Sequence, residues 1–103
     1  MKSTQTTVLT KAILKQCEPV SQILKSLSHP VRLKILCSIL DGEKTVNELT
    51  EFCEISQSAM SQFLNRMKLE GIVVSRRDRT FVYYGVADSK ITQLLKALKE
   101  IYC

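Results

Sequence analysis

Four cysteines are the side chains of this sequence that are best suited to chemistry: Cys17, Cys37, Cys53 and Cys103. Thiols can ligate metals, undergo redox reactions or fill an apolar core. His29 is the only histidine of the 103 residues, which excludes a histidine-rich metal site. There is no Cys-x-x-Cys pair, no catalytic histidine partner and no glycine-rich cofactor loop. We therefore predict a protein that is not an enzyme and that has no cofactor.

A polar helix face is the second chemical feature, and it suits hydrogen bonding to nucleic acid. Between residues 56 and 67 apolar side chains recur on one side of a helix, and amide and hydroxyl groups occupy the other. Gln and Asn can bond adenine in a bidentate way, and Ser and a helix N-terminus suit phosphates. The alternative is an ordinary polar surface helix. We predict DNA contacts from Ser56, Gln57, Ser58, Ser61, Gln62, Asn65 and Arg66.

Three arginines follow this helix, namely Arg76, Arg77 and Arg79. They cluster at the predicted tip of a β-hairpin, whose strands span residues 72–77 and 80–86 and whose tip spans 77–79. A lone basic turn is usually a solvated loop, but a basic hairpin after a helix pair indicates a DNA-contacting wing. The net charge of +5 also favours a polyanionic partner. We expect strongly salt-dependent binding to double-stranded DNA.

Apolar periodicity predicts the elements that position these groups. Helices are expected over residues 7–27, 31–40, 45–53, 56–70 and 88–103, with the hairpin between the last two. The first helix either bends at Pro19 or divides there into two. The class is therefore α+β, a single winged helix-turn-helix domain over residues 1–103, in which residues 1–6 are the candidate for disorder.

Local capping signals set the helix ends. His29 is expected to serve a helix start rather than a ligand role, and Thr45 with Glu48 forms a capping box. Ser56 and Asp88 are further N-caps, and Gly71 stops the reading helix.

The first and last helices carry more apolar surface than a winged core needs to cover. We predict that residues 7–27 and 88–103 are dimerisation helices, and that the homodimer presents two reading helices to a palindromic operator. Core packing within one chain is the alternative.

No apolar segment is long enough for a signal peptide or a membrane span, so we expect a cytoplasmic protein without a membrane partner, whose thiols are normally reduced.

Three sequence blocks resemble the ArsR/SmtB family of winged-helix repressors: LSHPVRLKIL at 27–36, SQSAMSQFL at 56–64, and the segment from GIV to VYY at 71–84. The resemblance covers roughly residues 19–103 and implies a dimeric repressor that leaves its promoter when an inducer binds. Many members sense metals, but the third-helix Cys-x-Cys is missing from residues 45–48. Lys90 and Ile101 stand where the zinc type needs imidazoles, although Asp88 is retained. The resemblance therefore implies no metal site of either type.

Cys37 and Cys103 instead match a two-cysteine subgroup of this family, whose members respond to reactive sulfur species or oxidants by linking the thiols of the second and last helices. Carried over, persulfide formation at this pair would lead to a polysulfide bridge between the two thiols and would release the DNA. One alternative is a metal-responsive repressor with cysteine ligands, and another is an interaction module with inert thiols. Cys37 itself shares a face with core leucines, and Cys17 and Cys53 are expected to be structural.

Overall fold

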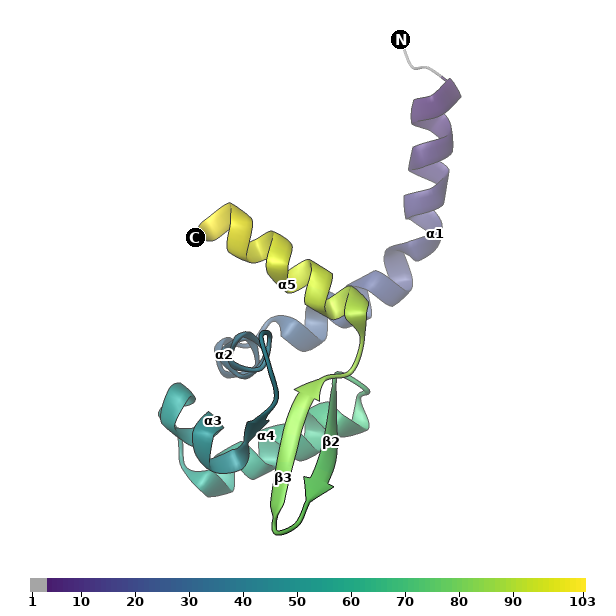
Figure 1. Cartoon of the computed structure of the whole chain (residues 1–103). Helices are drawn as coiled ribbons and strands as arrows, with labels where there is room; N and C mark the ends of the chain where they lie inside the picture. The colour runs from purple at the N-terminus through teal and green to yellow at the C-terminus, as the bar shows by residue number, and fades with distance from the viewer. Residues whose placement is uncertain (1–3) are drawn as a thin grey trace.

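The computed structural model describes residues 4–103, with side chains from Val8 onward. Within this range the chain forms five helices and a small antiparallel sheet, which lies at the end of the molecule away from the start of α1 (Figure 1). The elements follow in the order α1 (Thr4–Leu27), α2 (Pro30–Ser38), β1 (Lys44–Thr45), α3 (Val46–Cys53), α4 (Gln57–Leu69), β2 (Val73–Asp78), β3 (Phe81–Val86) and α5 (Ser89–Tyr102). The order of helices, hairpin and final helix is the predicted one.

Helix α1 is one continuous helix that contains Pro19 and changes direction part-way along, so the single bent helix is the correct alternative (Figure 1). Its first half projects away from the other elements. The radius of gyration is accordingly 16.5 Å, against about 13 Å for a compact domain of this length. The helix begins at Thr4, before the predicted residue 7, and residues 1–3 of the segment proposed for disorder lie outside the described residues.

The capping predictions are confirmed at each helix start. The Nδ1 atom of His29 accepts a hydrogen bond from the Val31 amide at 3.1 Å. Thr45 and Glu48 form the reciprocal capping box, and Ser56 and Asp88 cap α4 and α5. Gly71 follows α4 with a φ of 76°, a left-handed conformation that glycine adopts without strain.

The sheet has the strand order β1-β3-β2, and β1 is an element that the sequence did not predict. The hairpin itself is confirmed, but its tip lies further along the chain than residues 77–79. Asp78 pairs with Phe81, so the connecting turn is Arg79 and Thr80, and Arg79 has a φ of 60°. Arg77 therefore belongs to strand β2 rather than to the turn.

The core lies where α2, α3, α4 and α5 meet the inner face of the hairpin. Seven large side chains are fully buried there: Ile35, Leu36, Leu49, Met60, Leu64, Met67 and Val73. Residues of α2, α3 and α4 dominate this set, so the reading helix is anchored along its apolar side. Of the α1 residues whose side chains are described, only Ile23 and Leu27, in its second half, belong to this core or pack against it.

Candidate functional site: a reading helix, a wing and a thiol pair

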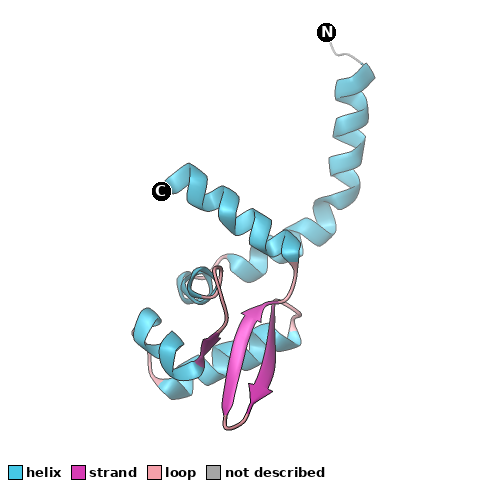
Figure 2. Ribbon diagram, viewed as in Figure 1, coloured by secondary structure: helices cyan, strands magenta, loops and turns pink. Residues whose placement is uncertain are grey.

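The polar face of α4 lies at the surface, as predicted. Gln57, Ser58, Ser61, Gln62 and Asn65 are all exposed, while Met60, Leu64 and Met67 on the opposite side are buried. A tight connection leads into α4 from α3, in which Glu54 adopts a left-handed conformation with a φ of 55°. Figure 2 shows the hairpin beside α4, at the same end of the molecule. The structure thus brings the predicted reading helix and wing together on one side.

Arg76 departs from the predicted cluster at the wing tip. Its Nε atom donates to Oε1 of Glu43 at 2.7 Å, and its guanidinium lies 4.8 Å from the ring centroid of Tyr83. Arg76 opposes Tyr83 in the β2–β3 register, which places it well before the turn. Only Arg77 and Arg79 therefore lie near the end of the wing, both of them exposed. Sequence periodicity could not reveal Glu43, which lies 33 residues away.

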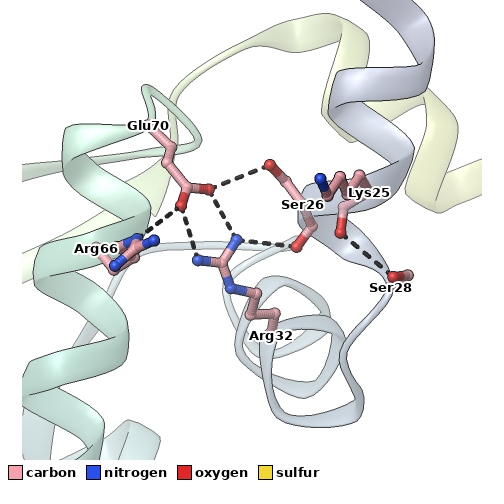
Figure 3. A network of polar contacts seen from close by, with 6 residues as sticks. All are labelled: Lys25, Ser26, Ser28, Arg32, Arg66 and Glu70. Carbon is pink, nitrogen blue, oxygen red and sulfur yellow. Dashed lines mark hydrogen bonds and ion pairs between the residues drawn. The ribbon is translucent and has the colours of Figure 1, made fainter.

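Glu70 is a polar centre that sequence reasoning missed, and it ties the end of α4 to α1 and α2 (Figure 3). Arg32 holds its carboxylate with two hydrogen bonds, of 2.8 and 3.0 Å, and also donates to the Ser26 carbonyl at 2.9 Å. The Ser26 hydroxyl and Nε of Arg66 donate to the same carboxylate, at 3.1 and 3.2 Å. Arg66, predicted to contact DNA, is thus partly engaged within the protein.

The electrostatic consequence is large for Glu70. The hydrogen bonds from Arg32 lower the pKa of the Glu70 carboxyl to about 2, with smaller contributions from Ser26, the Arg32 charge and Arg66. Because the two Arg32–Glu70 bonds are parallel and bidentate, they fix geometry as well as charge. They set the position of the reading helix relative to α2.

Cys37 and Cys103 line one common hollow of about 590 Å³ between α2 and α5. Apolar side chains make up most of its wall, with Asp41 and Lys99 as its charged members. Cys37 reaches the surface rather than filling the core, contrary to the alternative based on its leucine neighbours. Partial burial nevertheless raises the pKa of the Cys37 thiol, and a negative charge on Cys103 raises it further. The two thiols are therefore near enough to interact electrostatically.

The other two thiols have separate surroundings. Cys53 is buried at the end of α3, and burial raises the pKa of its thiol, which makes it a poor nucleophile, as expected of a structural cysteine. Cys17 is exposed on α1, and its thiol donates to the Ile13 carbonyl at 3.4 Å, so it does not pack in the core of this chain. Among the described residues, no three His, Cys, Asp or Glu side chains gather as metal ligands.

Comparison with known proteins assigns this arrangement to a family. The profile described as bacterial regulatory protein, arsR family, matches residues 29–75, from the start of α2 into β2. The biofilm growth-associated repressor of Xylella fastidiosa is 39% identical over 89 residues, which are 86% of this chain and 78% of that protein. The chain belongs to the ArsR family of bacterial regulatory proteins. The resemblance carried by the three sequence blocks is thereby confirmed.

Solved structures agree with this ArsR-family assignment. The crystal structure of the transcriptional repressor BigR from Xylella fastidiosa has a TM-score of 0.85 and 37% identity, and the match covers 91% of this chain and 96% of that one. A homodimeric winged helix-turn-helix DNA-binding domain from Mycobacterium bovis has a TM-score of 0.71 and 26% identity, covering 97% and 86%. The ArsR-family chain is thus a winged-helix, DNA-binding transcription regulator and not an enzyme. Within residues 4–103, no helix is long and apolar enough to cross a membrane.

Proposed function

We propose that this ArsR-family regulator is a homodimeric repressor that binds a palindromic operator and is released when Cys37 and Cys103 become linked. The observation that carries the proposal is the position of both thiols on one hollow between α2 and α5. The repressors among its relatives support the direction of regulation. Such a protein acts in the cytoplasm, where its DNA lies and where thiols are normally reduced.

The proposed DNA surface consists of the exposed face of α4 and the end of the wing. Amide groups on α4 read base edges, while Ser56 and Ser58 near its N-terminus and the two tip arginines contact phosphates. Base contacts and phosphate contacts have different signatures, because each neutralised phosphate releases counterions and adds about 0.9 to the salt slope. This difference makes the two halves of the surface separable by experiment.

Gln62→Ala and Arg79→Ala should therefore weaken operator binding in different ways. For Gln62→Ala we expect about a tenfold loss on the specific site, no change on unrelated DNA and an unchanged salt slope. For Arg79→Ala we expect similar losses on both DNAs and a slope smaller by about 0.9. Fluorescence anisotropy against salt measures both quantities. Equal losses of Gln62→Ala on specific and unrelated DNA would show that α4 does not read bases.

The thiol chemistry needs only a donor of sulfane sulfur, such as an organic persulfide. Each cysteine thiolate attacks the terminal sulfur of a donor, forming a new S–S bond and expelling the donor thiolate, so that both residues carry a persulfide. The Cys37 persulfide anion then attacks the inner sulfur of the Cys103 persulfide, or the reverse. A three-sulfur bridge forms and hydrosulfide leaves, with no further oxidant. A peroxide would instead oxidise one thiolate to a sulfenic acid, which the second thiolate converts to a disulfide with loss of hydroxide.

A polysulfide bridge spans more than the short Cα separation that a plain disulfide requires. It would join the end of α2 to the end of α5, two helices that are far apart in the sequence. A covalent link there favours one arrangement of the reading heads, and an arrangement that fits the operator less well lowers affinity. The expected loss of operator affinity follows only from the difference in fit between the two arrangements.

Treatment of the wild-type protein with a persulfide donor should weaken operator binding by about tenfold, within the usual range of allosteric coupling. Cys37→Ser and Cys103→Ser should each abolish this response while leaving the affinity of the untreated protein unchanged. Anisotropy measures the affinity, and intact mass with peptide mapping shows the added sulfur and the bridge. Cys17→Ser is the matched control, because it removes an exposed thiol away from the hollow.

Parallel samples with peroxide and with zinc distinguish the alternatives. Release by zinc but not by the persulfide donor would favour a metal-responsive repressor with cysteine ligands. Normal release in both serine variants would contradict the proposed switch. If the wild type shows no salt-sensitive DNA binding, an interaction module with inert thiols becomes the better description.

A further inference from the structure

The segment of residues 41–45 connects the thiol hollow to the wing. At one end, Asp41 lines the hollow together with Cys37 and Leu40 of the α2 end. At the other end, β1 pairs with β3, with Lys44 opposite Tyr84 and Thr45 opposite Tyr83. The same five residues thus touch both parts of the proposed mechanism.

Two local contacts of Lys44 join the two ends of this segment. The Lys44 ammonium donates to the Gly42 carbonyl at 3.3 Å and lies 3.6 Å from the Asp41 carboxylate. Both contacts are local and lie across the turn that follows α2. These contacts join the two ends of the turn that separates the hollow from β1.

Glu43 is the contact of this segment with the outer strand of the wing. Its Oε1 atom accepts the 2.7 Å hydrogen bond from Nε of Arg76 in β2, across the whole sheet. The side chain of Glu43 lies against Gly85 of β3. A Cβ atom added to Gly85 would be 3.4 Å from Cγ of Glu43. Arg76 is also held over the Tyr83 ring. The Glu43 side chain thus lies against β3 and forms a hydrogen bond with β2.

The Glu43–Arg76 pair orients the wing more than it stabilises the fold. The two side chains are 38% and 55% exposed, and ion pairs this exposed contribute little to folding free energy. Arg76 is paired with Glu43 within the protein. Among the described arginines of the hairpin, Arg77 and Arg79 are therefore left as the free cations near the wing tip. An exposed pair without a stability role is well placed for a positioning role.

We propose that Glu43 and Arg76 are positioning residues that couple the state of the thiol pair to the wing. The coupling rests on the proposed function. In the reduced protein the pair holds the hairpin in the orientation that fits DNA. Linking Cys37 to Cys103 pulls the end of α2 toward α5 and displaces Asp41. Residues 41–45 move with Asp41, and through Glu43 they rotate Arg76 and the wing.

The test compares wild type, Glu43→Gln, Arg76→Gln and the double variant, each reduced and each linked by a persulfide donor. For Glu43→Gln we expect a threefold or greater loss of affinity in the reduced form and a response to linking that is less than a third of the wild-type response. The double variant should resemble either single variant, because both remove one interaction. The salt slope of Arg76→Gln should stay within about 0.3 of wild type, unlike the loss of about 0.9 for a phosphate contact.

Glu51→Gln is the matched control, since it removes the same charge from an exposed residue of the neighbouring helix α3. Removal of a negative charge alone predicts that both Glu→Gln variants bind DNA more tightly. Weaker DNA binding by Glu43→Gln would therefore indicate a positioning effect rather than a charge effect. Thermal melting verifies that each variant folds. If wild type and Glu43→Gln lose operator affinity equally on treatment with the persulfide donor, the coupling is wrong but the proposed function stands. A wild type that does not respond overturns the proposed function, and the coupling with it.

Discussion

Ile13→Glu is expected to convert the protein into a monomer and to weaken operator binding by about a hundredfold. Ile13 is 58% exposed in the first half of α1, and the exposed Leu9, Val20 and Leu24 lie along the same face of the helix. An uncovered apolar row of this length is the surface that a second copy would bury. A carboxylate placed there would be buried without a partner in each copy, at a cost of several kcal/mol. A loss of about 2.7 kcal/mol corresponds to a hundredfold change in binding.

Sedimentation velocity and operator titration measure the two effects on the same sample. Lys11→Gln is the matched control, because it changes the charge by the same amount on the opposite side of α1. It should leave the dimer intact. A dimeric Ile13→Glu variant with normal DNA affinity would show that the first half of α1 does not form the interface.

Features encoded within a few residues of each other were predicted well from the sequence. The capping box at Thr45, the Ser56 cap and the Gly71 stop are local patterns whose hydrogen bonds join residues no more than four apart. The apolar face of α4 follows from helical periodicity for the same reason. These local signals were enough to predict a winged helix-turn-helix domain.

Features that join distant residues were not predicted. Strand β1 has only two residues and no apolar alternation, so its pairing with β3 exists only because the hairpin is there. Arg76 was expected at the wing tip because it is adjacent to Arg77, but a carboxylate 33 residues earlier holds it in place. The Cys37–Cys103 pair was proposed through a family resemblance, because spacing along the chain does not reveal that α2 and α5 line one hollow.

The polar network around Glu70 shows how such long-range contacts organise the protein. Arg32 lies on α2, and its side chain is only 13% exposed, so its charge needs a partner. Glu70 supplies that partner from the end of the reading helix, and Ser26 adds the end of α1. The reading helix, the proposed dimer helix and the helix that bears Cys37 therefore meet at one carboxylate.

Glu70→Gln should lower the free energy of unfolding at pH 7 by about 2 kcal/mol. The folded-state pKa of about 2 lies below the ordinary value of 4.5, and each pKa unit corresponds to about 1.4 kcal/mol. The Glu70 side chain is 30% exposed, so solvent screening reduces the full value to about 2 kcal/mol. The pKa is lowered, so the stabilisation is fully present above pH 4.5 and is lost as the pH falls toward 2.

Urea unfolding of wild type and Glu70→Gln between pH 7 and pH 3, at one fixed protomer concentration, measures this difference. The gap between the two proteins should shrink to less than half by pH 3, because Glu70 of the unfolded chain, with its ordinary pKa of 4.5, is then protonated while that of the folded protein is still largely ionised. Glu51→Gln, an exposed acid of α3, should show no such gap at any pH in this range. A gap for Glu70→Gln that stays constant with pH would mean that the variant loses packing or hydrogen bonding rather than charge. The Arg32–Glu70 pair would then fix the position of the reading helix without its charge contributing to stability.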